Sequence, residues 1–290
     1  MKISKKYNLK NLKPGVYRMS DADYFSNENP ALSQSTVKQI YDKSYAKIMR
    51  EKSKVDTKAL AVGSLFHTLI LEAGEIEDRF VICEKGRTSK TFKEMQIEVE
   101  KEGKRLVSQP EVEEVKEFSN EALKNKGLIH ILKNCERELA VIGKIDDVLI
   151  KTKDDILLKN DDGSYTLLDL KTSSQDKHSP NNVMQTIFRF GYDQQLAVYR
   201  EILSQHVEVK SVGLVFVDKD SGEVAMYKLG ERMLERGLEK FKSNLAEFVA
   251  QKNGKNIFET AIEIDIPEAV NSSNAIDSEL MNLTNKKDSA

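Results

Sequence analysis

Apolar and polar positions alternate in the middle of the chain with the two-residue period of β-strands. The segments with this pattern are 80–84, 138–150, 154–159, 165–172, 211–218 and 223–230. Between the strands 154–159 and 165–172, Asp161-Asp162-Gly163 predicts a hairpin turn, and Asp220-Ser221-Gly222 predicts a second hairpin further on. We therefore expect a sheet in which neighbouring strands of the chain often pair directly.

Helical spacing of apolar residues flanks these strands on both sides. The segments with this spacing are 32–52, 57–73, 109–125, 181–204 and 230–252. Segment 57–73 is apolar on nearly all sides, which predicts a buried helix. The order of elements favours one α/β or α+β domain, with a central mixed sheet flanked by helices. We expect an irregular lead-in over 1–30, the domain over 31–265, and a polar, loosely ordered tail over 266–290.

Charge limits how this protein could bind a polyanion. The 290 residues include 32% charged residues, but the opposite signs nearly cancel and leave a net charge of -2. Any nucleic-acid binding must therefore use a local basic surface rather than the charge of the whole chain.

Cysteine content and hydropathy exclude several classes of protein. Cys83 and Cys135 are far apart and form no CxxC motif, which excludes a cysteine-based zinc site and a four-cysteine iron–sulfur cluster. We interpret both as buried thiols of a reducing cytosol. The chain has no apolar leader segment, and no apolar run approaches the roughly 20 residues that span a bilayer. We therefore expect a soluble, cytoplasmic protein without a membrane partner.

The strand 165–172 contains a carboxylate and an ammonium group that the two-residue period places on one face. Asp169 and Lys171 project together, whereas Leu170 between them points to the opposite face. A solvated ion pair explains an isolated pair of this kind, because exposed pairs of opposite charge are common.

A second carboxylate changes the interpretation of this pair. We expect strand 138–150 to place Asp146 or Asp147 beside Asp169, and we prefer Asp146. Two adjacent carboxylates repel each other unless a cation lies between them, and oxygen ligands favour Mg²⁺ or Mn²⁺ over zinc. Such a site supports phosphodiester hydrolysis, with Lys171 positioning or deprotonating the attacking water and stabilising charge in the transition state.

Four short motifs in order resemble a known nuclease class. They are GSLFH (63–67), Glu138 with GKIDD (143–147), LDLKT (168–172) and YDQQLAVY (192–199). Together with ALSQSTVKQI and GRTSKTFKE, they resemble the RecB-like branch of the PD-(D/E)XK nucleases, and above all the RecE-type phage exonucleases with an exodeoxyribonuclease VIII-like domain. The resemblance covers residues 30–250 and implies the restriction-endonuclease-like fold.

The resemblance also implies roles for individual residues. His67, Asp146 and Asp169 would bind the metal, with the backbone carbonyl of Leu170 completing the coordination. Lys171 would be the catalytic lysine, Gln195 would orient the site or contact DNA, and Glu138 matches an acidic position of related nucleases. The proline of the family motif is missing before Asp146, where Ile145 stands instead.

Several further residues are candidates for contacts with DNA. The candidates are Ser35, Arg87, Thr88, Lys90, Tyr192 and Tyr199. Each has an alternative interpretation: Ser35 as a helix cap, the basic residues near Arg87 as a solvated face, and the two tyrosines as a packing face of their helix. No segment predicts a reader of bases, so DNA ends and structure would govern cleavage rather than sequence.

The activity implied is a Mg²⁺-dependent 5′-to-3′ exonuclease of double-stranded DNA ends, with Mn²⁺ able to substitute. Relatives of this type act in phage recombination with a single-strand annealing, RecT-like recombinase, and form ring-shaped homo-oligomers; a phage-encoded protein would work in the bacterial cytoplasm. The alternatives are a non-catalytic DNA-binding or assembly module on the same fold, a Cas4-like nuclease, and a site- or structure-specific endonuclease.

Overall fold

The computed structural model describes residues 1–50, 57–174, 177 and 179–254. Residues 1–249 form one compact unit. Both cysteines are free thiols. Within these ranges, no helix is both long and apolar enough to cross a membrane. The predicted polar tail and the end of the predicted domain, residues 255–265, lie outside the described residues.

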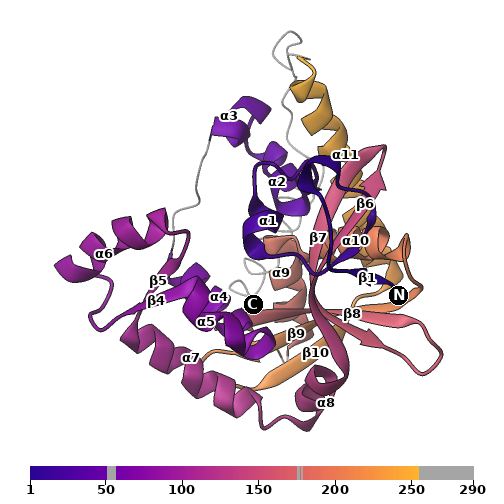
Figure 1. Cartoon of the computed structure of the whole chain (residues 1–290). Helices are drawn as coiled ribbons and strands as arrows, with labels where there is room; N and C mark the ends of the chain where they lie inside the picture. Colours follow the sequence, from indigo (N-terminus) through magenta and orange to yellow (C-terminus); the bar gives the residue numbers. More distant parts are fainter. Residues whose placement is uncertain (51–56, 175–176, 178, 255–290) are drawn as a thin grey trace, which may run out of the picture. The chain divides into compact units, whose positions relative to one another are not determined.

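A mixed sheet is the centre of the compact unit (Figure 1). Its strands follow the order β1-β2-β6-β7-β8-β9-β10, and β3 pairs with β7 beside this path. The strands are β1 (Ile3–Ser4), β2 (Gly15–Tyr17), β3 (Leu32–Ser33), β6 (Cys135–Ile145), β7 (Val148–Lys159), β8 (Tyr165–Ser173), β9 (Val209–Asp218) and β10 (Val224–Lys228). Strands β6, β7 and β8 are antiparallel neighbours, whereas β8 and β9 are parallel. The predicted mixed sheet flanked by helices is confirmed.

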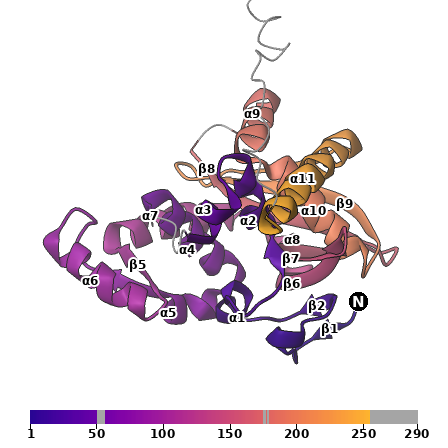
Figure 2. The same cartoon turned by 90° about the horizontal axis from the view of Figure 1, so that it is seen from above.

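Helices cover both faces of this sheet (Figures 1 and 2). One face packs against α2 (Gln34–Lys38), α9 (Pro180–Phe190), α10 (Tyr192–Ser204) and α11 (Glu231–Lys252). The other face packs against α4 (Lys58–Leu71), α7 (Gln109–Ala122) and α8 (Lys126–Asn134). Helix α4 is buried along most of its length, as its apolar sequence predicts. Its N-cap is Thr57, whose side chain accepts from the backbone N–H of Leu60.

The remaining elements lie outside the central layers. They are η1 (Leu9–Asn11), α1 (Asp21–Phe25), η2 (Gln39–Tyr41), α3 (Tyr45–Arg50), η3 (Ala73–Glu75), α5 (Ile76–Arg79), β4 (Phe80–Cys83), α6 (Lys90–Lys101) and β5 (Arg105–Ser108). Strands β4 and β5 form a separate two-stranded parallel sheet. The lead-in over 1–30 is less irregular than predicted, because β2 pairs with β6 at the edge of the main sheet.

Three predicted elements are divided in the structure. The expected strand 138–150 is two strands, because Asp146 and Asp147 form a tight turn between β6 and β7. The expected helix 181–204 is broken at Gly191, whose φ of 69° lies in the left-handed region that favours glycine. Segment 32–50 contains β3, α2, η2 and α3 instead of one helix, with Ser33 as the N-cap of α2.

Both predicted hairpins are confirmed. Strands β7 and β8 pair across the turn that contains Gly163, which has a φ of 87°. Strands β9 and β10 pair across the turn that contains Gly222, which has a φ of 73°. The first of these hairpins fixes the register on which the candidate site depends.

Candidate metal centre and active site

Three carboxylates lie in a row across β6, β7 and β8. The pairs Arg137↔Ile156 and Leu139↔Asp154 place Glu138 opposite Asp155. The last pair of β7 and β8 is Ile156↔Leu168, so Asp155 and Asp169 follow directly where these two strands diverge. Directly opposite side chains on neighbouring strands are roughly 5 Å apart, and like charges there are destabilising. A row of three acids is therefore a place where a bound cation would relieve repulsion.

Helix α4 adds a histidine to this row. The Nε2 atom of His67 lies 2.6 Å from the carbonyl oxygen of Leu170, and its Nδ1 atom lies 3.7 Å from Oδ2 of Asp155. The N–H of Leu170 donates to the same carboxylate oxygen at 2.8 Å. Ligand atoms of His67, Glu138 and Asp155 all lie within 4.8 Å of one another. These three residues form a group that could hold a metal ion.

Asp169 and Lys171 share one face of β8, as the alternation predicts. The Nζ atom of Lys171 lies 2.6 Å from Oδ2 of Asp169, and the side chain of Asp169 is almost fully buried. Gln195 of α10 donates from Nε2 to Oδ1 of Asp169 at 2.9 Å. Both oxygens of this carboxylate therefore have a fixed neighbour, one cationic and one neutral.

Electrostatics at the site reflect crowding of buried acids. Burial, and then the charge of Asp155, raise the pKa of Glu138 to about 7. Burial, and then the charge of Asp169, raise the pKa of Asp155 to about 7. Burial, and then the charge of Lys171, lower the pKa of His67, which favours the neutral imidazole that binds metals. Burial opposes the charged form of Lys171, but Asp169 and Asp155 outweigh it and raise the lysine pKa above its usual value.

Asp146 does not join this site, and the expected position beside Asp169 is wrong. Asp146 is exposed in the two-residue turn that Ile145 and Val148 close. Its φ of 47° and the 62° of Asp147 are the paired positive values of a type I′ turn, which aspartate tolerates. Val148 and Asp155 are seven residues apart on one strand, so at roughly 3.3 Å per residue the turn lies about 23 Å from the acidic row.

Asp155 is the residue that the sequence interpretation missed. It lies in segment 154–159, which was predicted as a strand, but no role was assigned to either aspartate there. The predicted hairpin contained the necessary signal. Asp155 and Asp169 are each seven residues from Asp162 in the turn, which places them opposite each other in a symmetric hairpin.

The two predicted tyrosines lie near the site in different surroundings. Tyr192 is half-buried, and its ring centroid lies 5.2 Å from Nζ of Lys171. Tyr199 packs against the core on the α10 side of the sheet. Burial raises the pKa of Tyr199 well above its usual value. Tyr192 therefore lies at the cavity beside Lys171, whereas Tyr199 packs in the core.

The other predicted DNA contacts lie elsewhere in the unit. Arg87 donates from Nε to Oε1 of Glu111 at 2.5 Å, next to the capping box at the start of α7. Ser35 is exposed, and its hydroxyl lies 3.0 Å from that of Ser33. Ser35, Arg87, Thr88 and Lys90 are not among the residues that line either cavity at the site. In the structure, Arg87 pairs with Glu111 and lies over the Phe92 ring. DNA contact by Thr88 and Lys90 stays a prediction.

A cationic cavity of about 660 Å³ opens on one side of the metal-binding group. His67 and Lys171 line it, and its other charged lining residues are Arg105, Lys177, Arg189 and Lys219. Within the described part of the chain, no aspartate or glutamate lines this cavity. It is a local basic surface of the kind that a chain with near-zero net charge would need to bind a polyanion.

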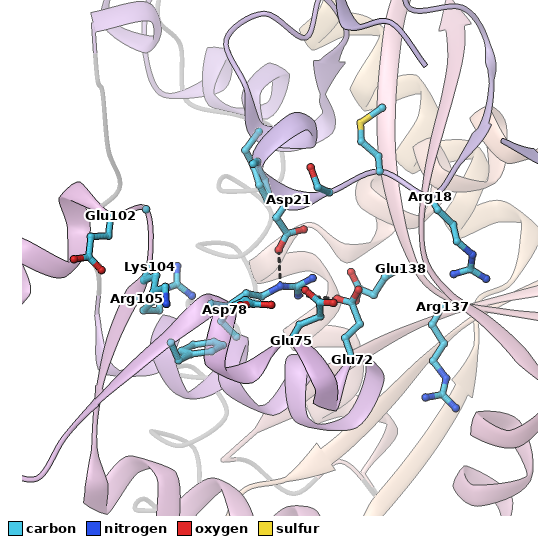
Figure 3. A pocket seen from close by; sticks show the side chains of 18 residues that line it. Arg18, Asp21, Glu72, Glu75, Asp78, Glu102, Lys104, Arg105, Arg137 and Glu138 are labelled. Carbon is cyan, nitrogen blue, oxygen red and sulfur yellow. Dashed lines mark ion pairs between the residues drawn. The ribbon is translucent and has the colours of Figure 1, made fainter. Parts of the chain in front are cut away.

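A second cavity of about 950 Å³ opens on the side of Glu138 (Figure 3). Its lining includes Asp21, Glu72, Glu75, Asp78, Glu102 and Glu138 together with Arg18, Arg79, Lys104, Arg105 and Arg137. Ion pairs occupy its inner end, where Arg79 bridges Asp21 and Glu72, and Lys153 bridges Asp21 and Glu138. Arg105 and Ser64 line both cavities, so the two cavities are adjacent. The described charged side chains of the first are cationic, whereas the second mixes six carboxylates with five cationic groups.

The donor set fits a hard divalent cation. Two carboxylates and an imidazole converge on one point, and the Leu170 carbonyl lies beside the imidazole. Asp169 lies next to this group through the register of β7 and β8. His67, Glu138 and Asp155 would hold the ion, with Asp169 and the Leu170 carbonyl close to it.

The sheet, the acidic row and the D-x-K strand define a PDDEXK-like domain. Comparison with known families gives the same class: the chain belongs to the family described as "PDDEXK-like domain of unknown function (DUF3799)", whose model matches residues 33–265. No curated protein matches the chain significantly.

One solved structure resembles this fold along most of the chain. It is a crystal structure named "Putative exonuclease", from Eubacterium rectale, which matches with a TM-score of 0.59 and 16% sequence identity. The match covers 86% of this chain and 96% of that one. At this identity the likeness establishes a common fold. The structure of SSO0001 aligns with a TM-score of 0.28 and 19% identity, covering 62% of this chain and 84% of its own. A TM-score this low does not indicate a common fold.

Proposed function

We propose that this protein is a Mg²⁺-dependent exonuclease that hydrolyses phosphodiester bonds at the ends of double-stranded DNA. The observation that carries the proposal is the convergence of His67, Glu138 and Asp155 on one point beside the Asp169–Lys171 pair. A divalent cation at this point, when bound, polarises a phosphoryl oxygen and lowers the pKa of a bound water. Mn²⁺ also prefers such oxygen and imidazole ligands, so it should substitute.

Side chains around the metal-binding group have different proposed roles in the reaction. The Lys171 ammonium lines the cationic cavity and stabilises the negative charge that develops on the phosphate. Gln195 holds the Asp169 carboxylate from α10, and this hydrogen bond keeps both oxygens oriented. His67, in its neutral form, is fixed by the Leu170 carbonyl, so its other nitrogen faces Asp155.

The two cavities give the substrate a direction of approach. A phosphodiester backbone is attracted to the cavity lined by Lys171, Lys177, Arg189 and Lys219. The opposite cavity mixes six carboxylates with five cationic groups, so it attracts the backbone less. DNA therefore reaches the metal-binding group from the Lys171 side.

The biological setting that we propose follows the RecE-type resemblance of the motifs. Degradation runs 5′ to 3′ and leaves a single strand for a RecT-like annealing recombinase in phage-type recombination. The active form is a ring-shaped homo-oligomer. A ring would keep a weakly anionic protein on DNA by enclosing the duplex within basic surfaces.

Digestion of labelled DNA tests the activity. Linear duplex labelled at one 5′ or one 3′ end is incubated with Mg²⁺ beside a covalently closed circle of the same sequence. We expect mononucleotides or short fragments from the linear DNA, with loss of the 5′ label first, and an intact circle. Cleavage of the circle would reject the exonuclease assignment. Full activity of an Asp169→Ala variant would reject the site, and no cleavage by the wild-type protein would leave the non-catalytic DNA-binding module.

A further inference from the structure

An aromatic side chain that no predicted motif includes lies at the cationic cavity. Phe190 ends α9, its side chain is 52% exposed, and it lines the cavity together with Lys171 and Tyr192. Single exposed apolar side chains are common on protein surfaces, so exposure alone does not mark Phe190; its place at the cavity beside Lys171 and Tyr192 does. The cavity thus combines cationic groups with an accessible aromatic surface.

The backbone fixes the Phe190 ring on top of Tyr192. Residues two positions apart on a continuous helix do not face each other. Gly191, in its left-handed conformation, separates α9 from α10, and the two rings stack with centroids 5.7 Å apart and planes at 25°. The Nζ atom of Lys38 donates to the carbonyl oxygen of Phe190 at 2.6 Å, which holds this junction. The stacked pair is therefore a built platform rather than a chance contact.

The stacked pair lies close to the Lys171 ammonium. The ring centroid of Tyr192 is 5.2 Å from Nζ of Lys171 and 5.7 Å from the Phe190 centroid, so Phe190 lies within about 11 Å of the lysine ammonium. Arg189 places its guanidinium carbon 5.6 Å from the Phe190 centroid. A ligand with a phosphate at Lys171 and a flat π-system at Phe190 has the chemistry of a nucleotide.

We propose that Phe190 stacks on the nucleobase at the end of the DNA substrate and thereby makes binding depend on an end. This proposal rests on the proposed function for the identity of the substrate. Inside a duplex, both faces of every base are covered by neighbouring bases, so only a terminal or unpaired base offers a face. Stacking of one base on an aromatic side chain contributes about 1–3 kcal/mol, which corresponds to roughly 5- to 150-fold in affinity. Phe190 is thus a specificity-determining residue for ends.

A binding cycle tests the contact without requiring cleavage. Dissociation constants are measured in Ca²⁺ for fluorescent duplexes that are intact or carry one abasic nucleotide at each of the first three positions from either end. The proteins are wild type, Phe190→Ala, Phe190→Leu and Phe190→Trp. At one of the three positions, we expect the abasic site and Phe190→Ala each to weaken binding by a factor of roughly 5 to 150. At that position, combining the two changes should weaken binding no further than either change alone. Phe190→Leu should behave like alanine, and Phe190→Trp like the wild type.

Phe188 provides the matched control. It is an exposed phenylalanine of the same helix, with Arg236 5.0 Å from its ring centroid, but it does not line the cavity. Phe188→Ala should leave all affinities unchanged. Equal affinity of wild type and Phe190→Ala for intact ends would overturn the proposal, as would multiplicative losses at every abasic position. Wild-type cleavage of the same duplexes in Mg²⁺ is scored separately, so failure of hydrolysis rejects the proposed function without affecting the result of the cycle.

Discussion

Two Asp-Asp pairs lie on the same strand-turn-strand unit, and they have opposite surroundings. Asp146-Asp147 forms the exposed turn between β6 and β7, where both residues have positive φ. Asp154-Asp155 is buried near the other end of β7, and Asp155 lies between Glu138 and Asp169. The same dipeptide therefore forms a turn in one place and, in the other, contributes Asp155 to the group that could hold a metal ion.

The difference shows what a buried carboxylate requires. Exposed aspartates in a turn are solvated and need no partner, whereas burial of an unpaired charge is costly. Asp155 accepts from the N–H of Leu170 and faces His67. Asp154 is fully buried, and its oxygens have no hydrogen-bond partner within the described part of the chain; burial raises its pKa well above the usual value. Burial and register, rather than local sequence, separate the Asp154-Asp155 pair from the turn.

Substituting one aspartate of each pair should give the largest difference in activity. Asp155→Asn should lower kcat/KM for linear DNA roughly 10²- to 10³-fold, because it removes a charged ligand from the reacting centre. Asp146→Asn should stay within about twofold of wild type, since surface changes of this kind rarely perturb a distant site. Initial rates of nucleotide release measure both. The comparison is rejected by a result in which Asp146→Asn is the more damaging change.

Removal of the Lys171 ammonium should have the next largest effect. Lys171→Ala should lower kcat roughly 10²-fold while the dissociation constant for DNA changes much less, because several other cationic groups line the cavity. Single-turnover rates and binding isotherms separate the two quantities. Lys219→Ala is the control from the same cavity and should weaken binding more than turnover. Equal losses of turnover and binding in Lys171→Ala would contradict its proposed role.

Metal binding should stabilise the folded protein only when the acidic row is intact. At a concentration 100-fold above the dissociation constant, Mn²⁺ should raise the free energy of unfolding by about 2.7 kcal/mol through linkage. Glu138→Gln and Asp155→Asn should reduce this gain, whereas Asp146→Asn should retain it. Thermal unfolding at increasing Mn²⁺ concentration gives the comparison. A gain that persists in both site variants would mean that the ion binds elsewhere.

The smallest effect concerns the turn itself. Asp147→Gly should stabilise the protein by about 0.5 kcal/mol, because its φ of 62° is favourable for glycine and type I′ turns prefer glycine at the second position. Urea unfolding measures the change. Asp155→Gly should by contrast make the β7 strand less favourable by roughly 0.5–1 kcal/mol, because glycine is unfavourable in the middle of a strand. Loss of stability in Asp147→Gly would show that the aspartate side chain is required in the turn.

Much of the site was predictable from residue types at short range. The strand period placed Asp169 and Lys171 on one face, and the motif resemblance indicated His67 and Gln195, which the structure places at the same centre. Glu138 was also named, although its position opposite Asp155 depends on pairing between strands. Local periodicity was sufficient wherever the related residues lie on the same strand or helix.

The error at Asp146 arose from a relation between elements. Segment 138–150 reads as one continuous strand because its apolar positions continue past Asp146-Asp147, and a type I′ turn of two aspartates lacks the glycine that usually marks it. Once that turn is missed, the first residues of β7 are assigned to the same strand as β6, and Asp146 is placed beside Asp169. Phe190 was missed for another reason, since its exposure depends on the break at Gly191 within an apparently continuous helix.

The position of the metal ion is the most direct test. Crystals of the full chain soaked in MnCl₂ and measured near the manganese absorption edge would locate the ion by its anomalous signal. The account predicts a peak among the side chains of His67, Glu138 and Asp155, and none at the Asp146-Asp147 turn. A peak at the turn, or bound manganese anywhere else with the acidic row empty, would contradict it.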